Sequence, residues 1–378
     1  MVLSDVILSD VITNFKFQGE FVAAREFEFG HINDTYILYF NGNGNIQDKD
    51  EFRYILQRIN QNVFKDPPQL MENIVKVVQH LRRKIAARGG DPRRETLNIV
   101  PSIEGANYFR CSQGGYWRAY EYIEGTQSYQ VVENAAQFYG AGRVVGKFQH
   151  MLSDFPADEL HETIPDFHNT SKRYEALMNA VERDPLHRAS NALPEIDMVR
   201  ARAGELSRLI DMQHRGSLPV RVIHNDTKFN NVLIDDKTGE GVCLVDLDTV
   251  MPGLALYDFG DAIRYGTNRA GEDQKDLSRV QMEMELFEEF CRGYFEEAGE
   301  FLTAEEVQCL AFSAWLITME VGIRFLTDYL EGDIYFKTQR EGQNLNRART
   351  QFKLVEDMEA KYEQMEAVVR KYGNIIIK

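Results

Sequence analysis

The sequence predicts an α+β protein of two lobes: a small β-rich N-terminal lobe with one helix, and a large, mainly helical C-terminal lobe. Two observations support this prediction. The first third of the chain alternates β-branched and aromatic segments with turn-forming residues, as strands and their connections do. After residue 124, long stretches with apolar residues at helical spacing dominate. We therefore expect one lobe at residues 1–123 and a second at residues 124–378.

In the first lobe, residues 22–40 and 52–60 are predicted strands, with an asparagine- and glycine-rich turn between them. Residues 67–85 begin with two prolines and repeat apolar residues at helical spacing, so they predict the helix of this lobe. Residues 96–102 and 116–125 predict two further strands.

The second lobe is predicted to be helical at residues 131–152, 194–216, 278–299 and 304–332. One short β region, residues 219–248, lies among these helices. Near the C-terminus an a/d stripe follows heptad spacing, and we expect it to pack on its own lobe rather than to form a coiled-coil dimer. The stripe consists of Met358, Tyr362, Met365, Val369 and Tyr372.

Composition narrows the classes of function. The chain has 378 residues, 43% of them hydrophobic, and a net charge of −16, which supports a real core and disfavours a nucleic-acid partner. Its four cysteines lack the spacing of a zinc site, which favours buried, reduced thiols. The first residues lack a basic region before an apolar run, and no segment approaches the roughly 18 apolar residues of a membrane span. We expect a cytoplasmic protein that binds neither nucleic acid nor membrane.

The β region at residues 219–248 contains the most informative residues. Residues 231–235 and 242–246 are predicted strands joined by a turn. If this turn is symmetric, Asn231 lies directly opposite Asp246, with Cβ atoms about 4.5 to 5.5 Å apart. Two oxygen ligands at that separation suit a hard cation such as Mg²⁺. A loop just before the hairpin presents Asp226 to the same place.

The spacing His224-x-Asp226-x-Lys228-x-x-Asn231 matches the catalytic loop H-R-D-x-x-x-x-N of protein kinases. In that scheme the aspartate accepts the proton of the substrate hydroxyl, and the asparagine and a later aspartate hold the metal ions. The later aspartate is normally the first residue of D-F-G, but the hairpin argument selects Asp246. The literal D-F-G at residues 258–260 is predicted to be helical.

Two neighbouring residues have alternative roles. Asp248 is either a second metal ligand or a solvated neighbour, and we favour the neighbour. Lys228 either orients the transferred phosphoryl group or is a solvated lysine. The whole region could also be an ordinary acidic hairpin, but that would leave the register of the motif residues without a reason.

The chain resembles the aminoglycoside phosphotransferase and choline kinase superfamily, small-molecule kinases with a protein-kinase-like bilobal fold. Within it, the chain is similar to the bacterial N-acetylhexosamine 1-kinases. The resembling stretches run nearly end to end and include GHINDTYIL, WRAYEYIEGTQSY, HNDTKFNNVLID, VDLDTVMPGLALYDFGDAIR and TMEVGIRFLTDYLEGDIYF. The resemblance implies ATP- and Mg²⁺-dependent phosphorylation of the anomeric C1 hydroxyl of GlcNAc or GalNAc, giving the sugar 1-phosphate.

The resemblance also implies roles for individual residues. Asp226 would be the base that acts on the C1 hydroxyl, and Asn231 and Asp246 would hold Mg²⁺. The residues that would contact the sugar, besides Asp226, are Thr249, Arg324 and Tyr335.

The residues by themselves leave alternatives for these sugar contacts. Arg324 lies on a largely apolar helix, where an arginine needs a partner or a ligand. Glu320 is four residues earlier on the same face and could pair with it; the resemblance favours the ligand. Tyr335 could pack at the core or its rim, and Thr249 could be a plain strand-end residue.

The N-terminal lobe, residues 1–123, would bind the nucleotide. Gly30 lies where protein kinases carry three glycines, and the resemblance places His31 and Asn33 near the phosphates. Where kinases have a phosphate-binding lysine, this chain has Gln57 and Arg58, and only one of them can face the cleft because strand side chains alternate. We favour Arg58 because it is charged; a surface arginine is the alternative.

Two further features complete this lobe. Glu72, on the predicted helix, would be the carboxylate that pairs with the phosphate-binding residue, or else a solvated side chain. The segment 120–125 would be the hinge, with backbone groups of Glu121 and Ile123 meeting adenine.

Three classes of function compete. We favour an N-acetylhexosamine kinase acting with ATP and Mg²⁺. A related kinase could act on another sugar, an amino alcohol or an aminoglycoside; an aminoglycoside site needs clustered carboxylates, whereas a cation lies at Arg324. A pseudokinase would lack the base or a metal ligand, yet Asp226, Asn231 and Asp246 are all present. A protein kinase is disfavoured because no A-P-E segment follows Asp246.

Overall fold

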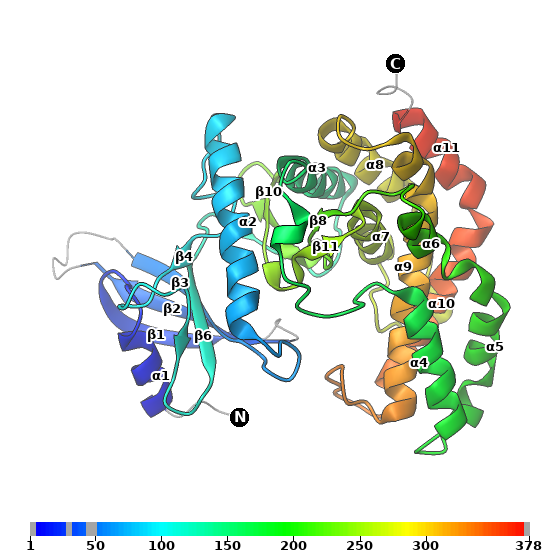
Figure 1. Ribbon diagram of the computed structural model, residues 1–378, viewed down its shortest axis with the longest axis horizontal. Coiled ribbons are helices and arrows are strands. Elements are labelled where there is room, and N and C mark those ends of the chain that lie inside the picture. The colour runs from blue at the N-terminus through cyan, green and yellow to red at the C-terminus, as the bar shows by residue number, and fades with distance from the viewer. Residues whose placement is uncertain (1–4, 28–31, 43–50, 374–378) are drawn as a thin grey trace. The chain divides into compact units, whose positions relative to one another are not determined.

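The computed structural model describes residues 5–27, 32–42 and 51–373. The chain forms two compact units, Met1–Gly125 together with Leu160–Ile164, and Thr126–Glu159 together with Pro165–Lys378. Strands dominate the first unit and helices the second (Figure 1). The predicted class, a β-rich N-terminal part and a mainly helical C-terminal part, is therefore confirmed.

An antiparallel sheet forms the frame of the first unit. Its strands follow the order β1-β2-β3-β6-β4, and β5 pairs with β6 outside this path. The strands are β1 (Glu20–Glu26), β2 (Asp34–Asn41), β3 (Glu51–Arg58), β4 (Ile99–Val100), β5 (Phe109–Arg110) and β6 (Tyr116–Glu121). Helix α2 (Pro67–Ala87) is the predicted helix, and the Asp66 side chain caps it by accepting from the Gln69 amide at 3.1 Å.

A further helix, α1 (Asp5–Thr13), lies in the first unit and was not predicted from the sequence. Asp10 interrupts the apolar run there, which hides the pattern. Val11 and Ile12, near the end of α1, and Phe15, just beyond it, are buried in the hydrophobic core of the unit. The end of α1 and the residues that follow it therefore anchor the helix to this core.

Helices build the second unit. They are α3 (Ala135–Met151), α4 (Thr170–Arg183), α5 (Leu193–Ala201), α6 (Arg208–His214), α7 (Ala255–Gly266), α8 (Met284–Ala298), α9 (Ala304–Glu331), α10 (Gln343–Ala360) and α11 (Tyr362–Gly373). Strands β7 (Thr126–Gln127), β9 (Val232–Asp235) and β10 (Gly241–Leu244) form one small sheet, and β8 (Arg221–Ile223) pairs with β11 (Met251–Gly253). All four cysteines of the chain are buried, as expected.

Two predicted helices are divided in the structure. Residues 194–216 form α5 and α6, with a 3-10 turn at Ala203–Glu205 between them. The C-terminal stripe is split at Lys361, between α10 and α11. Its residues Met358, Met365 and Val369 are buried, and α11 packs on α8 and α9 of its own unit, as expected.

Helix α9 is the central helix of the second unit and packs against α4, α7, α10 and α11. Among the described residues it is the one helix long and apolar enough to cross a membrane, with a mean hydropathy of 1.5, although the sequence analysis expected none. This value is the mean over an 18-residue window of α9, and 94% of that window is buried inside the protein, so α9 serves as a core helix.

The contact of α7 with α9 depends on a glycine. A Cβ added at Gly260 would lie 2.5 Å from the carbonyl oxygen of Ser313 on α9, closer than real Cβ atoms come. Gly260 thus allows the two helix backbones to approach each other. This matters for the site because α7 also contains Asp258 and Arg264.

Candidate active site

The loop at residues 224–231 joins β8 to β9 and contains the predicted catalytic motif. Asp258 of α7 holds the start of this loop. Its Oδ1 accepts from the Asn225 amide at 2.7 Å, and its Oδ2 accepts from the His224 amide at 2.9 Å. The Thr227 hydroxyl donates to the Asp258 carbonyl. Asn225 itself adopts a left-handed backbone conformation, with φ of 67°.

The literal D-F-G is therefore part of a helix, as predicted, and its aspartate has a structural contact that the sequence analysis missed. Asp258 is 0% exposed, and Gln149 of α3 donates to it at 3.0 Å. Burial raises the pKa of the Asp258 carboxyl, while the amides of His224 and Asn225 favour its ionised form. Because these partners lie more than thirty residues away, no local signal in the sequence could show the contact.

The carboxylate of Asp226 lies between a cation and an amide. Lys228 Nζ is 3.0 Å from Asp226 Oδ1, and Asn231 Nδ2 donates to Oδ2 at 3.1 Å and to the Asp226 carbonyl at 2.8 Å. Burial opposes ionisation, but the charge and hydrogen bond of Lys228 outweigh it and hold the pKa of Asp226 below its ordinary value. The loop therefore presents an ionised carboxylate, able to accept a hydrogen bond from a hydroxyl group.

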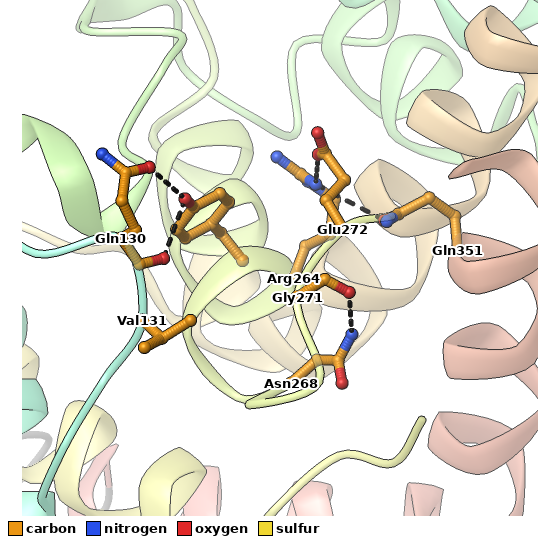
Figure 2. Close-up of a pocket in the computed structure, with 8 residues that line it drawn as sticks. Gln130, Val131, Arg264, Asn268, Gly271, Glu272 and Gln351 are labelled. Carbon is orange, nitrogen blue, oxygen red and sulfur yellow. Dashed lines mark hydrogen bonds and ion pairs between the residues drawn. The ribbon is translucent and has the colours of Figure 1, made fainter. Parts of the chain in front are cut away.

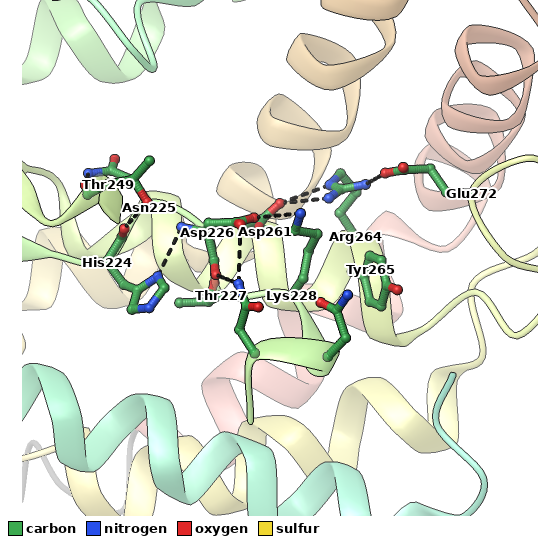
Figure 3. Close-up of polar contacts among 12 residues, drawn as sticks. His224, Asn225, Asp226, Thr227, Lys228, Thr249, Asp261, Arg264, Tyr265 and Glu272 are labelled. Carbon is green, nitrogen blue, oxygen red and sulfur yellow. Dashed lines mark hydrogen bonds and ion pairs between the residues drawn. The ribbon is translucent and has the colours of Figure 1, made fainter. Parts of the chain in front are cut away.

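Behind Lys228 lies an ionic cluster that the sequence analysis did not predict (Figure 3). Arg264 Nε donates to Asp261 Oδ1 at 3.0 Å, and Arg264 Nη1 donates to Glu272 at 2.7 Å. The charges of Asp226, Glu272 and Asp261 raise the pKa of Lys228 although burial would lower it. Lys228 is thus a cation held among carboxylates rather than a solvated lysine.

The same cluster borders a small pocket on α7 and the following loop, drawn in Figure 2. The pocket has about 10 Å³ of space, room for about one water molecule. The Tyr265 hydroxyl at this pocket donates to the Gln130 carbonyl at 3.0 Å. The pocket is lined by Gln130, Val131, Arg264, Tyr265, Asn268, Gly271, Glu272 and Gln351.

The predicted register of the hairpin is wrong by one residue. The Val245 amide donates to the Asn231 carbonyl at 2.9 Å, so Asn231 lies opposite Val245 rather than Asp246. The turn is shorter than predicted, because the Asp235 amide donates to the Glu240 carbonyl at 2.9 Å, which shifts the pairing by two residues. Val242, an extra residue in β10 relative to β9, then restores one of the two.

The two predicted metal ligands, Asn231 and Asp246, still lie close together, because Asp246 directly follows Val245, the partner of Asn231. Carboxylate and amide oxygens are ligands that suit Mg²⁺. The Asn231 side-chain nitrogen faces Asp226, which turns its oxygen away from that carboxylate. Asp246 lies two residues after β10 in a left-handed conformation, with φ of 62°, so strand alternation does not continue through it. In residues 5–27, 32–42 and 51–373, no three His, Cys, Asp or Glu side chains gather to hold a metal. Mg²⁺ in phosphoryl-transfer sites is bound by one or two protein carboxylates together with substrate phosphates, and one carboxylate with one amide oxygen fits that chemistry.

The segment that follows Asp246 is buried, including its polar residues Asp248 and Thr249. Asp248 is only 5% exposed, so it is not the solvated neighbour that the sequence favoured. Thr249 is 9% exposed; its hydroxyl donates to the His224 carbonyl at 2.7 Å, and its carbonyl accepts from Asn225 Nδ2 at 2.7 Å. Thr249 therefore supports the 224–231 loop, and its hydroxyl could meet a ligand only as an acceptor.

Aromatic rings surround Arg324 on α9. The guanidinium carbon lies 4.9, 5.8 and 5.6 Å from the ring centroids of Phe167, Tyr335 and Phe336. Glu320 is engaged elsewhere, since its two oxygens bind His168 at 2.7 Å and Thr170 at 2.6 Å. The Glu320–Arg324 ion pair considered from the sequence is not formed in the described part of the chain.

The turn that follows α9 brings Tyr335 to Arg324. The Asp328 carboxylate accepts the backbone amides of Ile334, Tyr335 and Phe336 at 2.9, 2.7 and 3.0 Å. This fixes a turn whose Tyr335 ring is 44% exposed, so Tyr335 is not a core residue. Asp328 was not among the site residues predicted from the sequence.

In the first unit, the side chains of Gln57 and Arg58 point to opposite faces of β3. Gln57 donates to the Thr35 hydroxyl at 3.1 Å and accepts from Arg118 at 3.0 Å, so it is held within the sheet. Arg58 faces the other side, with 42% of its side chain exposed and Nη1 3.9 Å from Asp34.

The other nucleotide-site predictions are placed as follows. Asn33, in the turn before β2, is buried, and its Oδ1 accepts from the amide of Asn60, just after β3, at 3.0 Å. The Glu121 amide donates to the Asn98 carbonyl at 2.8 Å, and Ile123 is 7% exposed. Gly30 and His31 lie outside the described residues. Glu72 pairs with Lys76 at 2.7 Å and His161 at 3.0 Å.

Comparison with known proteins identifies the family. Residues 23–305 match the model of the phosphotransferase enzyme family, and the chain belongs to this family. A microcompartment-associated aminopropanol kinase is similar in structure, with a TM-score of 0.59 and 16% identity over 96% of this chain and 99% of the other. An aminoglycoside phosphotransferase from Alicyclobacillus acidocaldarius also has a TM-score of 0.59, with 14% identity over 98% of this chain and 97% of the other.

An amicoumacin kinase solved with AMP-PNP and Ca²⁺ gives a TM-score of 0.55 and 14% identity over 91% of this chain and 90% of the other. These likenesses show a common kinase-like fold. The family places the chain among phosphotransferases.

Proposed function

We propose that this phosphotransferase is an ATP-dependent kinase that phosphorylates the anomeric C1 hydroxyl of N-acetylhexosamines, GlcNAc or GalNAc, to give the sugar 1-phosphate. Residues 1–123 would form the nucleotide-binding lobe, and residues 124–378 the catalytic and substrate-binding lobe of a cytoplasmic enzyme. The family match and the occurrence of AMP-PNP in the amicoumacin kinase structure support the nucleotide.

Asp226 is the proposed base. Its ionised carboxylate would accept a hydrogen bond from the C1 hydroxyl and orient it in line with the transferred phosphoryl group. Lys228, held beside Asp226 at 3.0 Å, adds positive charge where phosphate oxygens would lie. Asn231 and Asp246 would hold Mg²⁺, which supplies charge neutralisation of the phosphate oxygens when bound. Arg58, Asn33, Gly30, His31 and the hinge backbone at Glu121 and Ile123 would bind the nucleotide.

The observation that supports the acceptor best is the guanidinium of Arg324 among three aromatic rings. Arg173 lies near it, because its Nη2 donates to the carbonyl of Phe167 at 2.8 Å; burial and the charge of Arg324 lower the pKa of Arg173. Two neighbouring arginines repel a cationic amino alcohol or aminoglycoside. A neutral sugar suits the same place, because its C–H face stacks on an aromatic ring and its acetamido carbonyl accepts hydrogen bonds from a guanidinium.

The test is an ADP-release assay with ATP, Mg²⁺ and a panel of GlcNAc, GalNAc, glucose, galactose, choline, aminopropanol and kanamycin. We expect turnover of the N-acetylhexosamines, and a loss of about 10²- to 10⁴-fold in Asp226→Asn. Asp236→Asn, in the exposed turn of the hairpin, is the matched control and should retain wild-type rates. Turnover of choline, aminopropanol or kanamycin would contradict the sugar assignment but keep Asp226 as base. ATP binding without turnover of any acceptor would instead favour a pseudokinase.

A further inference from the structure

The peptide bond between Asn225 and Asp226 is held at both ends by histidine rings. At one end, the Asp226 amide donates to His224 Nδ1 at 3.2 Å. At the other end, the Asn225 carbonyl faces His168 Nε2 at 3.4 Å. His168 precedes α4, far from the loop in sequence. Since this peptide contains the backbone nitrogen of Asp226, its orientation sets the position of the proposed base.

The partners of the two rings determine different protonation states. His224 Nδ1 accepts a hydrogen bond, and its Nε2 donates to the Val245 carbonyl at 2.9 Å, so His224 is neutral. Both partners of His168 are acceptors: Glu320 Oε1, 2.7 Å from Nδ1, and the Asn225 carbonyl. With Glu320 ionised, both nitrogens of His168 would donate, which is the hydrogen-bond pattern of an imidazolium.

Burial makes this ion pair sensitive to the loss of either partner. The His168 side chain is 3% exposed and that of Glu320 is 0% exposed. Burial alone would raise the pKa of Glu320, but the charge and hydrogen bond of His168, the charge of Arg324 and the Thr170 hydroxyl bring it below its ordinary value. Removing one charge would leave the other buried without compensation.

The same two residues lead to Arg324. Glu320 lies one helical turn before Arg324 on α9. The neighbour of His168 in sequence, Phe167, places its ring 4.9 Å from the Arg324 guanidinium carbon, and the two rings of Phe167 and His168 are 4.7 Å apart. The buried His168–Glu320 pair thus lies between the peptide before Asp226 and the Arg324 region, and it adjoins Arg324 through the Phe167 ring and one turn of α9.

We propose that His168, as an imidazolium paired with Glu320, is a positioning residue for Asp226 that couples the Arg324 region to the 224–231 loop. The role of Asp226 as base rests on the proposed function, whereas the contacts and the charge state of His168 do not. His168 would touch neither substrate; it acts by fixing the carbonyl end of the Asn225–Asp226 peptide.

Kinetics separate this role from a general structural one. His168→Gln can donate to the Asn225 carbonyl or to Glu320, but not to both. We expect kcat per folded enzyme to fall about 10- to 100-fold, the cost of a small displacement of a catalytic group, while both KM values change less than about threefold. His214→Gln, an exposed histidine at the end of α6, is the matched control and should leave kcat unchanged.

Glu320→Gln should reproduce the loss of kcat, and the double variant His168→Gln/Glu320→Gln should lose less than the product of the two single effects, because both act through one contact. A kcat equal to that of wild type in His168→Gln, or full additivity of the two substitutions, would overturn the proposal.

Nitrogen-15 NMR of the wild-type enzyme tests the charge state without any acceptor. With the eight histidines labelled, we expect both ring nitrogens of His168 protonated at neutral pH and only Nε2 protonated in His224. A neutral His168 would overturn the proposal whichever acceptor is used. Since this measurement needs neither substrate nor variant, a failure of the sugar assignment is distinguishable from a failure of this inference.

Discussion

The carboxylate of Asp258 and the backbone amide of Asn225 lie 2.7 Å apart, and through this contact α7 holds the start of the 224–231 loop. Asn225 has a positive φ of 67°, a conformation that few side chains tolerate without support. Its amide, its side-chain nitrogen and its carbonyl are each engaged, by Asp258, Thr249 and His168. The residue directly before Asp226 is thus fixed on three sides.

Asp258→Asn should loosen the loop. The amide keeps one acceptor oxygen and turns an NH₂ group toward backbone amides that can only donate, so one buried amide loses its partner. We expect the free energy of unfolding to fall by about 1 to 3 kcal/mol and kcat to fall at least about tenfold. Urea unfolding and the ADP-release assay measure the two effects. Asp236→Asn, in the exposed hairpin turn, should change neither; equal behaviour of the two variants would contradict the role of Asp258.

Lys228→Met should change the pH dependence of the reaction. In the wild type the pKa of Asp226 lies below its ordinary value, so Asp226 should give kcat/KM no acidic limb above about pH 4. In Lys228→Met, burial acts without the lysine charge and raises the pKa of Asp226, so kcat/KM should show an acidic limb at higher pH than in the wild type. The same sign holds for stability: Asp226 stabilises the fold above its unfolded pKa and loses that contribution as pH falls through its lower folded pKa.

The measurement is kcat/KM of Lys228→Met divided by that of wild type at each pH, which cancels the ionisation of the substrates. Lys237→Met, an exposed lysine in the turn between β9 and β10, should give a flat ratio. A flat ratio for Lys228→Met as well would show that Lys228 does not control the ionisation of Asp226.

The metal assignment predicts a change in Mg²⁺ dependence. Asp246→Asn and Asn231→Ala each remove a proposed ligand, so the Mg²⁺ concentration for half-maximal rate should rise at least about tenfold, and EDTA should abolish turnover of the wild type. Titration of the rate with Mg²⁺ checks this. If Asp246→Asn keeps the wild-type titration curve while Asp258→Asn shifts it, the literal D-F-G would be the metal site after all.

The close approach of α7 to α9 predicts opposite effects for two glycine substitutions. Gly260→Ala places a Cβ 2.5 Å from the Ser313 carbonyl oxygen and should lower the free energy of unfolding by about 1 to 3 kcal/mol. At Gly204, between α5 and α6, a Cβ meets nothing within 4 Å, so Gly204→Ala should be neutral or stabilising by up to about 1 kcal/mol. Urea unfolding of both variants checks the pair, and a neutral Gly260→Ala would contradict the packing.

The candidate site was predictable where its residues are close in sequence. His224, Asp226 and Asn231 share one short motif, so their spacing alone indicated the loop. The hairpin was predictable from its apolar strands, but its register was not, because neither the short turn that pairs Asp235 with Glu240 nor the bulge at Val242 leaves a mark in the sequence.

Contacts between distant segments were the part that the sequence could not supply. For Glu320 the sequence offered Arg324, one helical turn away, whereas the structure pairs Glu320 with His168, 152 residues distant. Asp258 likewise meets the loop across more than thirty residues. Helical spacing predicts neighbours on the same helix only, so partners brought together by packing remain invisible to it.

Arg324 provides the sharpest test of the acceptor. Arg324→Met removes the charge and the planar group that lies over Phe167, Tyr335 and Phe336. Loss of a charge-assisted hydrogen bond costs about 1.5 to 3 kcal/mol, so KM for the N-acetylhexosamine should rise about 10- to 100-fold while KM for ATP stays constant. Arg324→Lys keeps the charge but not the planar group, so its KM for the N-acetylhexosamine should lie between those of the wild type and Arg324→Met.

Arg183→Gln, an exposed arginine on α4 that pairs with Glu331, is the control and should leave both constants unchanged. Removal of the cation should also shift the ratio of kcat/KM for GlcNAc over choline toward choline. An acceptor KM that is unchanged in Arg324→Met would make Arg324 a structural residue and remove the main support for a sugar acceptor.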